Sequence, residues 1–105
     1  MRAVAISAIV VVLLTSNALA LSPAAQRGFV FVNSNCSRCH AIGKYGDSPL
    51  PMAPPFRTLH EKYPVENLQE ALAEGIVTGH PNMPAFELDP GQINDVIAYL
   101  KSLEN

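Results

Sequence analysis

The run Cys36-Ser37-Arg38-Cys39-His40 combines two thiols and an imidazole at a spacing typical of covalent haem attachment. Thiols three residues apart face the same side of a helical turn, so each can add to a vinyl group of one haem. The imidazole of His40 follows directly and can reach the iron as its proximal ligand. This spacing predicts one covalently bound haem c, attached through Cys36 and Cys39 and ligated by His40.

The C-x-x-C spacing also occurs in two other kinds of site. Thiol-disulfide redox motifs stand in a βαβ context, and zinc sites require two further ligands. Neither context accompanies this pair, because the chain has only two cysteines and its other histidines, His60 and His80, form no recognised zinc spacing with them. The adjacent His40 therefore favours haem over both alternatives.

Met83 is the candidate for the opposite axial position of the iron. It stands between Asn82 and Pro84, where proline restrains the backbone and would hold the thioether in a defined place. The ordinary alternative is a methionine that fills a gap in the core. Two competing ligands are Met52, which lies in a loop that we assign to the proximal side, and His80, which would lower the reduction potential.

The first 20 residues have the pattern of a secretory signal peptide. A basic start precedes an apolar stretch from Ala3 to Leu14, and Ala18-Leu19-Ala20 forms a cleavage signal. An uncleaved membrane anchor is the alternative, but the apolar stretch is shorter than the roughly 20 residues that a spanning helix requires. We therefore expect residues 1–20 to be removed and residues 21–105 to form one periplasmic domain.

The size and charge of residues 21–105 restrict the classes of partner. The range is long enough for a single small domain with a thin core, which a covalently attached macrocycle can strengthen. It holds six Lys and Arg against nine Asp and Glu, a formal charge of −3. This balance argues against nucleic acid and favours electrostatic docking onto a positively charged patch. We expect a monomer.

Apolar spacing and capping residues predict three main helices. The first runs from about Pro23 to Asn33 and begins with a capping hydroxyl followed by proline. The second runs from about Val65 to Val77 and carries a solvated acidic face. The third begins with a capping box and continues to the end of the chain. The supporting residues are Ser22, Gly28, Phe31 and Val32 for the first helix; Val65, Leu68, Leu72 and Ile76, with Glu66, Glu70 and Glu74, for the second; and Asp89, Pro90, Gln92, Ile93, Val96, Ile97, Leu100 and Leu103 for the third.

Two segments rich in glycine and proline, 43–55 and 78–86, exclude both a helix interior and a central strand. We expect 43–55 to form an ordered loop across one face of the haem. A proximal imidazole usually needs its outer N–H bonded, so a backbone carbonyl of this loop is the expected acceptor for His40. A short helix is expected over 55–62.

These elements together resemble those of class I c-type cytochromes over nearly all of residues 21–105. The resemblance is carried by Gly28 and Phe31 before the C-x-x-C-H run, and by Ala53-Pro54-Pro55-Phe56, Met83-Pro84 and Ile97-Ala98-Tyr99-Leu100. It implies an all-α fold of three main helices and ordered loops around one haem. It further implies that Gly28 packs against Tyr99, and that the carbonyl of Pro54 accepts the proximal histidine's N–H.

The function that this resemblance implies is electron transfer between redox proteins, with His40 and Met83 filling both axial positions of the iron. Such a carrier needs no catalytic residue and binds no small-molecule substrate. Two alternatives remain at this point. One is a gas-binding or peroxidatic haem protein with a labile sixth ligand, and the other is a haem subunit of a dehydrogenase or oxidase complex.

Overall fold

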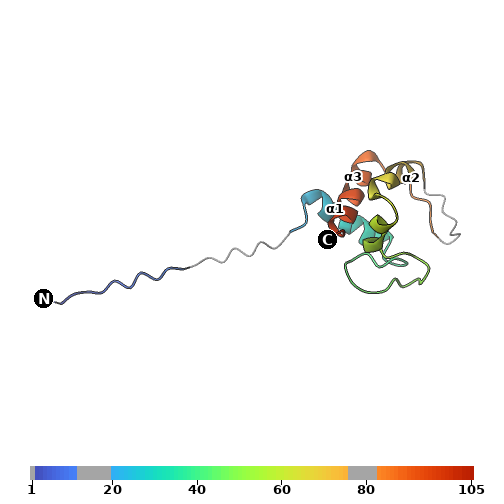
Figure 1. The fold of residues 1–105 in the computed structure, drawn as a ribbon. Helices are drawn as coiled ribbons and strands as arrows, with labels where there is room; N and C mark the ends of the chain where they lie inside the picture. Colours follow the sequence, from blue (N-terminus) through green and yellow to red (C-terminus); the bar gives the residue numbers. More distant parts are fainter. Residues whose placement is uncertain (1, 12–19, 76–82) are drawn as a thin grey trace.

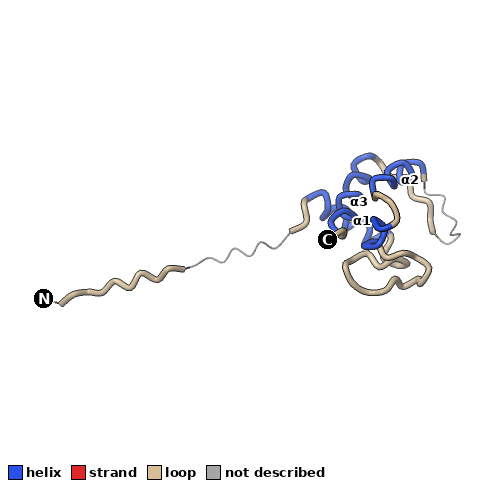
Figure 2. Tube along the Cα trace, in the orientation of Figure 1, coloured by secondary structure: helices blue, strands red, loops and turns tan. Residues whose placement is uncertain are grey.

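The structure is a computed structural model that describes residues 2–11, 20–75 and 83–105. The described part contains helices and no strand, which confirms the all-α prediction (Figures 1 and 2). The three main helices are present, with two short 3-10 helices between the first and the second. In chain order the elements are α1 (Pro23–Asn35), η1 (Phe56–Glu61), η2 (Val65–Asn67), α2 (Leu68–Glu74) and α3 (Pro90–Ser102).

The N-terminal residues 2–11 are exposed and have no regular secondary structure (Figure 2). Within the described residues, no helix has the length and apolar character that crossing a membrane would require. Much of the predicted signal peptide, including most of its cleavage signal, lies outside the described residues. Its removal therefore stays a prediction.

Helix α1 begins where its capping residues predict and ends two residues later than expected. The N–H of Ala25 donates to Ser22 Oγ at 3.1 Å, which satisfies one of the free donors of the first turn. At the other end the N–H of Cys36 donates to the Val32 carbonyl at 2.8 Å, so helical bonding continues to the attachment motif. The sequence has neither glycine nor proline there to stop the helix.

The predicted helix over 65–77 is shorter than expected and is divided. It begins as the 3-10 turn η2, in which the N–H of Asn67 donates to the Pro64 carbonyl at 3.0 Å, and becomes α-helical only at Leu68. Gly75 then ends α2 with a φ of 93°, a left-handed value that glycine adopts without strain. Ile76 lies outside the described residues. The helix expected over 55–62 is present as η1, also in 3-10 form.

Helix α3 has the predicted capping box. The N–H of Gln92 donates to Asp89 Oδ1 at 2.8 Å, and the Gln92 side chain accepts from the N–H of Asp89 at 3.1 Å. Pro90 occupies the first turn, where its missing N–H costs nothing. The predicted core face is buried and consists of Ile93, Val96, Ile97, Leu100 and Leu103, joined by Tyr99.

Helices α1 and α3 pack together at Gly28. A Cβ atom at this position would lie 2.8 Å from Cβ of Tyr99 and would also meet the backbone carbonyl of Asp95, so only glycine allows this approach. The contact between Gly28 and Tyr99 is therefore confirmed. Directly before Gly28, Arg27 donates two hydrogen bonds to the Asp95 carboxylate at 3.0 and 3.1 Å, which joins the same two helices at their surface.

Replacing Gly28 with alanine is expected to lower the free energy of unfolding by about 2–3 kcal/mol, because the added methyl group overlaps backbone atoms of α3. Denaturant unfolding of the haem-loaded protein measures this loss. Gly43→Ala is the matched control, since a Cβ at Gly43 meets no atom within 4 Å. Equal stability of the two variants would contradict the close helix contact.

Candidate functional site

The helices and the loop after the attachment motif enclose a cavity of about 350 Å³ with mostly apolar walls. Its volume lies in the range of about 300–1,000 Å³ that is typical of cofactor sites. All five residues predicted for the haem site line this cavity, although they come from three separate segments. They are Cys36, Cys39, His40, Pro54 and Met83.

Cys36 and Cys39 lie on the turn that follows α1. The N–H of Cys39 and the N–H of His40 both donate to the Cys36 carbonyl, at 3.2 and 3.0 Å, which places the three side chains on one short turn. Both thiols are half-buried and neither is in a disulfide. Burial, helped by the neighbouring Cys39, raises the pKa of Cys36 to about 11, so the thiol is protonated at neutral pH.

The imidazole of His40 is held in one orientation by the loop. Its Nδ1 atom lies 2.8 Å from the carbonyl oxygen of Pro54. A carbonyl can only accept, so Nδ1 carries the hydrogen and Nε2 keeps a free lone pair for a metal. The ring also packs on Phe56, with centroids 4.8 Å apart and planes tilted by 38°.

The loop over 41–55 is ordered by hydrogen bonds to the attachment motif. The N–H of Leu50 donates to the Cys39 carbonyl at 3.1 Å, and the N–H of Phe56 donates to the Ala41 carbonyl at 2.9 Å. Ser48 Oγ accepts from the N–H of Ala41 at 3.0 Å. These bonds fix the position of the Pro54 carbonyl against His40.

Tyr99 connects this loop to α3. Its hydroxyl donates to the Ile42 carbonyl at 2.6 Å, two residues beyond His40, while its ring packs against Phe29 with centroids 5.6 Å apart. Helix α3, which packs against Gly28, therefore also restrains the segment that carries the His40 imidazole.

Met83 reaches the cavity on a separate segment that two contacts position. The Phe86 ring packs edge-on against Phe31 of α1 at 6.4 Å, and the N–H of Leu88 donates to the Leu72 carbonyl of α2 at 2.8 Å. Met83 itself is half-buried. Its competitor Met52 also lines the cavity but leaves 64% of its surface exposed. The other competitor, His80, lies outside the described residues.

The two alternatives to haem have little support in the described ranges. No group of three or more His, Cys, Asp or Glu side chains among these residues could hold a metal ion, as a zinc site would require. The strands that would form the βαβ surroundings of a thiol-disulfide site are also missing from that part of the chain.

Comparisons with known proteins agree with the assignment of this cavity as a haem site. Residues 25–104 match the family model of cytochrome c. The chain belongs to the cytochrome c family. A curated relative, described as cytochrome c-553-like and found in Synechocystis sp., is 32% identical over 89 residues, which cover 84% of this chain and 77% of the relative. No solved structure gives a significant match.

As a cytochrome c, the protein carries one covalently bound haem c and is a haem-based electron carrier. The site fits this group. One short turn brings two thiols to the cavity. The hydrogen bond between His40 Nδ1 and the Pro54 carbonyl leaves the Nε2 lone pair of His40 free. Half-buried Met83 adds a thioether, which suits iron as a ligand.

Several residues of the cavity wall have no role predicted from the sequence. Leu59 is buried and Tyr63 is half-buried, and both line the cavity beside Phe56. Phe56 and Leu59 are three residues apart, the period of a 3-10 helix, and this spacing could have indicated their shared face. Phe86 contacts Phe31 of a distant segment, and Ser48 accepts a hydrogen bond within an irregular loop; neither contact has a comparable signal in the sequence.

Tyr99→Phe is expected to lower the free energy of unfolding by about 1–2 kcal/mol at neutral pH, because the Ile42 carbonyl loses its donor. Denaturant unfolding of the haem-loaded protein tests this, with Tyr45→Phe as control, since the Tyr45 side chain is 89% exposed. Unchanged stability of Tyr99→Phe would contradict the role of the hydroxyl.

The difference between the native protein and Tyr99→Phe is also expected to depend on pH. Burial raises the pKa of Tyr99 above its ordinary value of 10.0, so the unfolded chain releases this proton at lower pH than the folded one. The contribution of the hydroxyl is fully present below the unfolded pKa and is lost as the pH rises through the folded value. The difference in unfolding free energy should therefore shrink above about pH 10.

Proposed function

We propose that the haem of this protein is attached through Cys36 and Cys39 and ligated by His40 and Met83, and that the protein moves single electrons between redox proteins after export. The observation that carries this proposal is the convergence of the four side chains on one apolar cavity. The Pro54 carbonyl further supports it, because it holds His40 in the tautomer that ligation requires.

Bound haem supplies one-electron chemistry by alternation of its iron between the ferrous and ferric states. The protein's residues determine how this exchange proceeds. His40 and Met83 would both ligate the iron, so no substrate would compete for it. The Met83 thioether and the apolar walls favour the less charged ferrous state and so raise the reduction potential.

Met83 is a better candidate for the distal ligand than Met52. Met83 is half-buried on a segment tied to α1 and α2, away from the loop that holds His40. Met52 follows Pro51 within the loop that contacts His40 through Pro54, and most of its surface is exposed. A half-buried thioether on a tethered segment can remain on the iron in both oxidation states, whereas an exposed one on a loop competes with water.

Export completes the proposed function. Residues 1–20 have the signal-peptide pattern, and α1 begins at Pro23, shortly after the predicted cleavage site. The cytochrome c family model begins to match at residue 25. We therefore infer a periplasmic protein of residues 21–105, with redox proteins as electron donor and acceptor and no catalytic role of its own.

Met83→Ala is expected to convert the reduced protein from low-spin to high-spin and to permit binding of carbon monoxide, because the sixth position of the iron opens. Visible absorption of the dithionite-reduced protein, before and after addition of carbon monoxide, measures both effects. Met52→Ala is the matched control and should stay low-spin, although its side chain lines the same cavity.

The spectra and the purification together distinguish the alternatives. Rapid binding of carbon monoxide by the unaltered protein would favour a gas-binding or peroxidatic haem protein. A high-spin Met52→Ala variant beside a low-spin Met83→Ala variant would reverse the ligand assignment. A haem subunit would copurify with a larger enzyme complex, whereas a free carrier purifies alone.

A further inference from the structure

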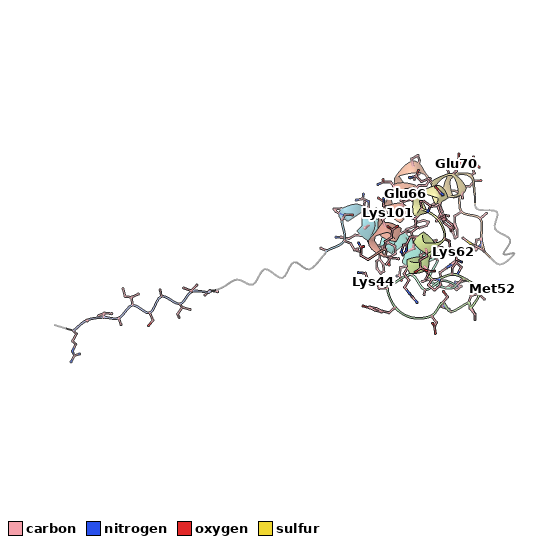
Figure 3. The ribbon with its side chains drawn as sticks, viewed as in Figure 1. Lys44, Met52, Lys62, Glu66, Glu70 and Lys101 are labelled. Atoms are coloured by element: carbon pink, nitrogen blue, oxygen red, sulfur yellow. The ribbon has the colours of Figure 1, made fainter. Side chains whose placement is uncertain are left out.

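Met52 is the exposed sulfur side chain of the haem site. Among the described sulfur side chains, Cys36, Cys39 and Met83 are half-buried, whereas Met52 leaves 64% of its surface exposed. Met52 also lines the cavity, so it belongs both to the cavity wall and to the outer surface. Figure 3 shows it on the loop, at the edge of the domain. Electron transfer through ligands on His40 and Met83 gives Met52 no role.

Hydrogen bonds of the loop hold Met52 beside the cavity. The N–H of Ala53 donates to the Leu50 carbonyl at 2.9 Å, which closes a turn around Pro51 and Met52. The N–H of Leu50 donates to the Cys39 carbonyl at 3.1 Å and so ties this turn to the attachment motif. Ala53, the next residue, is buried. A chemical change at Met52 therefore takes place at a fixed point of the haem site.

An exposed thioether is open to attack on a hydroperoxide. The sulfur lone pair takes one oxygen of hydrogen peroxide: the S–O bond forms, the O–O bond breaks, and the hydrogen of the transferred oxygen moves to the leaving hydroxide, which departs as water. The sulfur loses two electrons and the peroxide gains them. The product is a sulfoxide, so an apolar side chain becomes a polar one. Met83 is protected by its lower exposure and by the proposed bond between its sulfur and the iron.

We propose that Met52 is an oxidation site through which hydroperoxides lower the reduction potential of the haem. The apolar walls of the cavity favour the less charged ferrous state, because the polarity around a haem affects its potential. A sulfoxide in this wall adds a strong dipole and attracts water, and both stabilise the ferric state. The change is reversible, since methionine sulfoxide reductases restore the thioether. This inference rests on the proposed ligation by Met83 and concerns the regulation of the same site.

Peptide mass spectrometry of the peroxide-treated ferric protein tests the selectivity. Trypsin places Met52 in residues 45–57, since it cleaves after Lys44 and Arg57. Met83 lies in a separate peptide, residues 63–101. The first peptide should gain one oxygen atom at least about tenfold faster than the second, because exposure governs this reaction. The unfolded protein, in which both methionines are exposed, gives the reference ratio. Equal or faster oxidation of Met83 in the folded protein would overturn the proposal.

A spectroelectrochemical titration measures the effect on the haem. Once Met52 is oxidised, the equilibrium constant for reduction should fall about threefold or more, a shift of roughly 30 mV, since a tenfold change corresponds to about 59 mV for one electron. Treatment with the two stereospecific methionine sulfoxide reductases should restore the original potential. A potential that stays the same after complete oxidation of Met52 would overturn the proposal.

Three variants separate the polarity at Met52 from other effects of peroxide. Met52→Gln introduces a polar group of similar length and should lower the potential without peroxide. Met52→Leu should keep the potential and abolish its response to peroxide. Val30→Gln is the matched control, because Val30 is 63% exposed on α1 and does not line the cavity. Equal shifts in Met52→Gln and Val30→Gln, or a persistent response of Met52→Leu to peroxide, would contradict the proposal.

The visible spectrum distinguishes failure of this inference from failure of the proposed ligation. A low-spin spectrum with an unchanged potential after oxidation of Met52 shows that only the oxidation switch is wrong. A high-spin spectrum after oxidation of Met52 alone shows that Met52, rather than Met83, ligates the iron, and then both proposals are wrong.

Discussion

An apolar cavity of about 350 Å³ inside so small a domain is the constraint on which the rest of the structure depends. Apolar walls that face an unfilled cavity of this size lack packing partners, which lowers the stability of a small domain. The haem is therefore part of the core as well as the redox centre. The walls come from α1, η1, α2 and α3, and they include Val32 of α1, Leu59 of η1, Leu72 of α2 and Leu100 of α3.

The contact between α1 and α3 determines where the candidate ligands lie. Gly28 allows the two helices to approach, and α3 then places the Tyr99 hydroxyl against the Ile42 carbonyl beside His40. The Met83 segment is positioned independently, by Phe86 against α1 and by Leu88 against α2. The proximal and distal sides of the cavity are thus anchored to one helical frame through different contacts. Such a frame would limit movement of both candidate ligands when the iron changes charge.

Much of this arrangement could be predicted because the decisive signals are local. The C-x-x-C-H run indicates haem chemistry by its spacing, and the box of Asp89 and Gln92 determines where α3 begins. The end of α1 was missed because neither glycine nor proline stops it, and the 3-10 turn after Pro64 resembles an α-helix in its apolar spacing. The hydrogen bond that Ser48 Oγ accepts from Ala41 depends on how the loop folds back, which no local pattern encodes.

Covalent attachment through Cys36 and Cys39 is the central claim, and the intact mass of the denatured protein tests it most directly. The protein would be purified from the periplasm of a host able to attach haem, then extracted with acidic butanone. The account predicts a single species with the mass of residues 21–105 plus one haem, unchanged by the extraction, with no thiol free to react with iodoacetamide. A mass that loses the haem on extraction and gains two alkyl groups would contradict it.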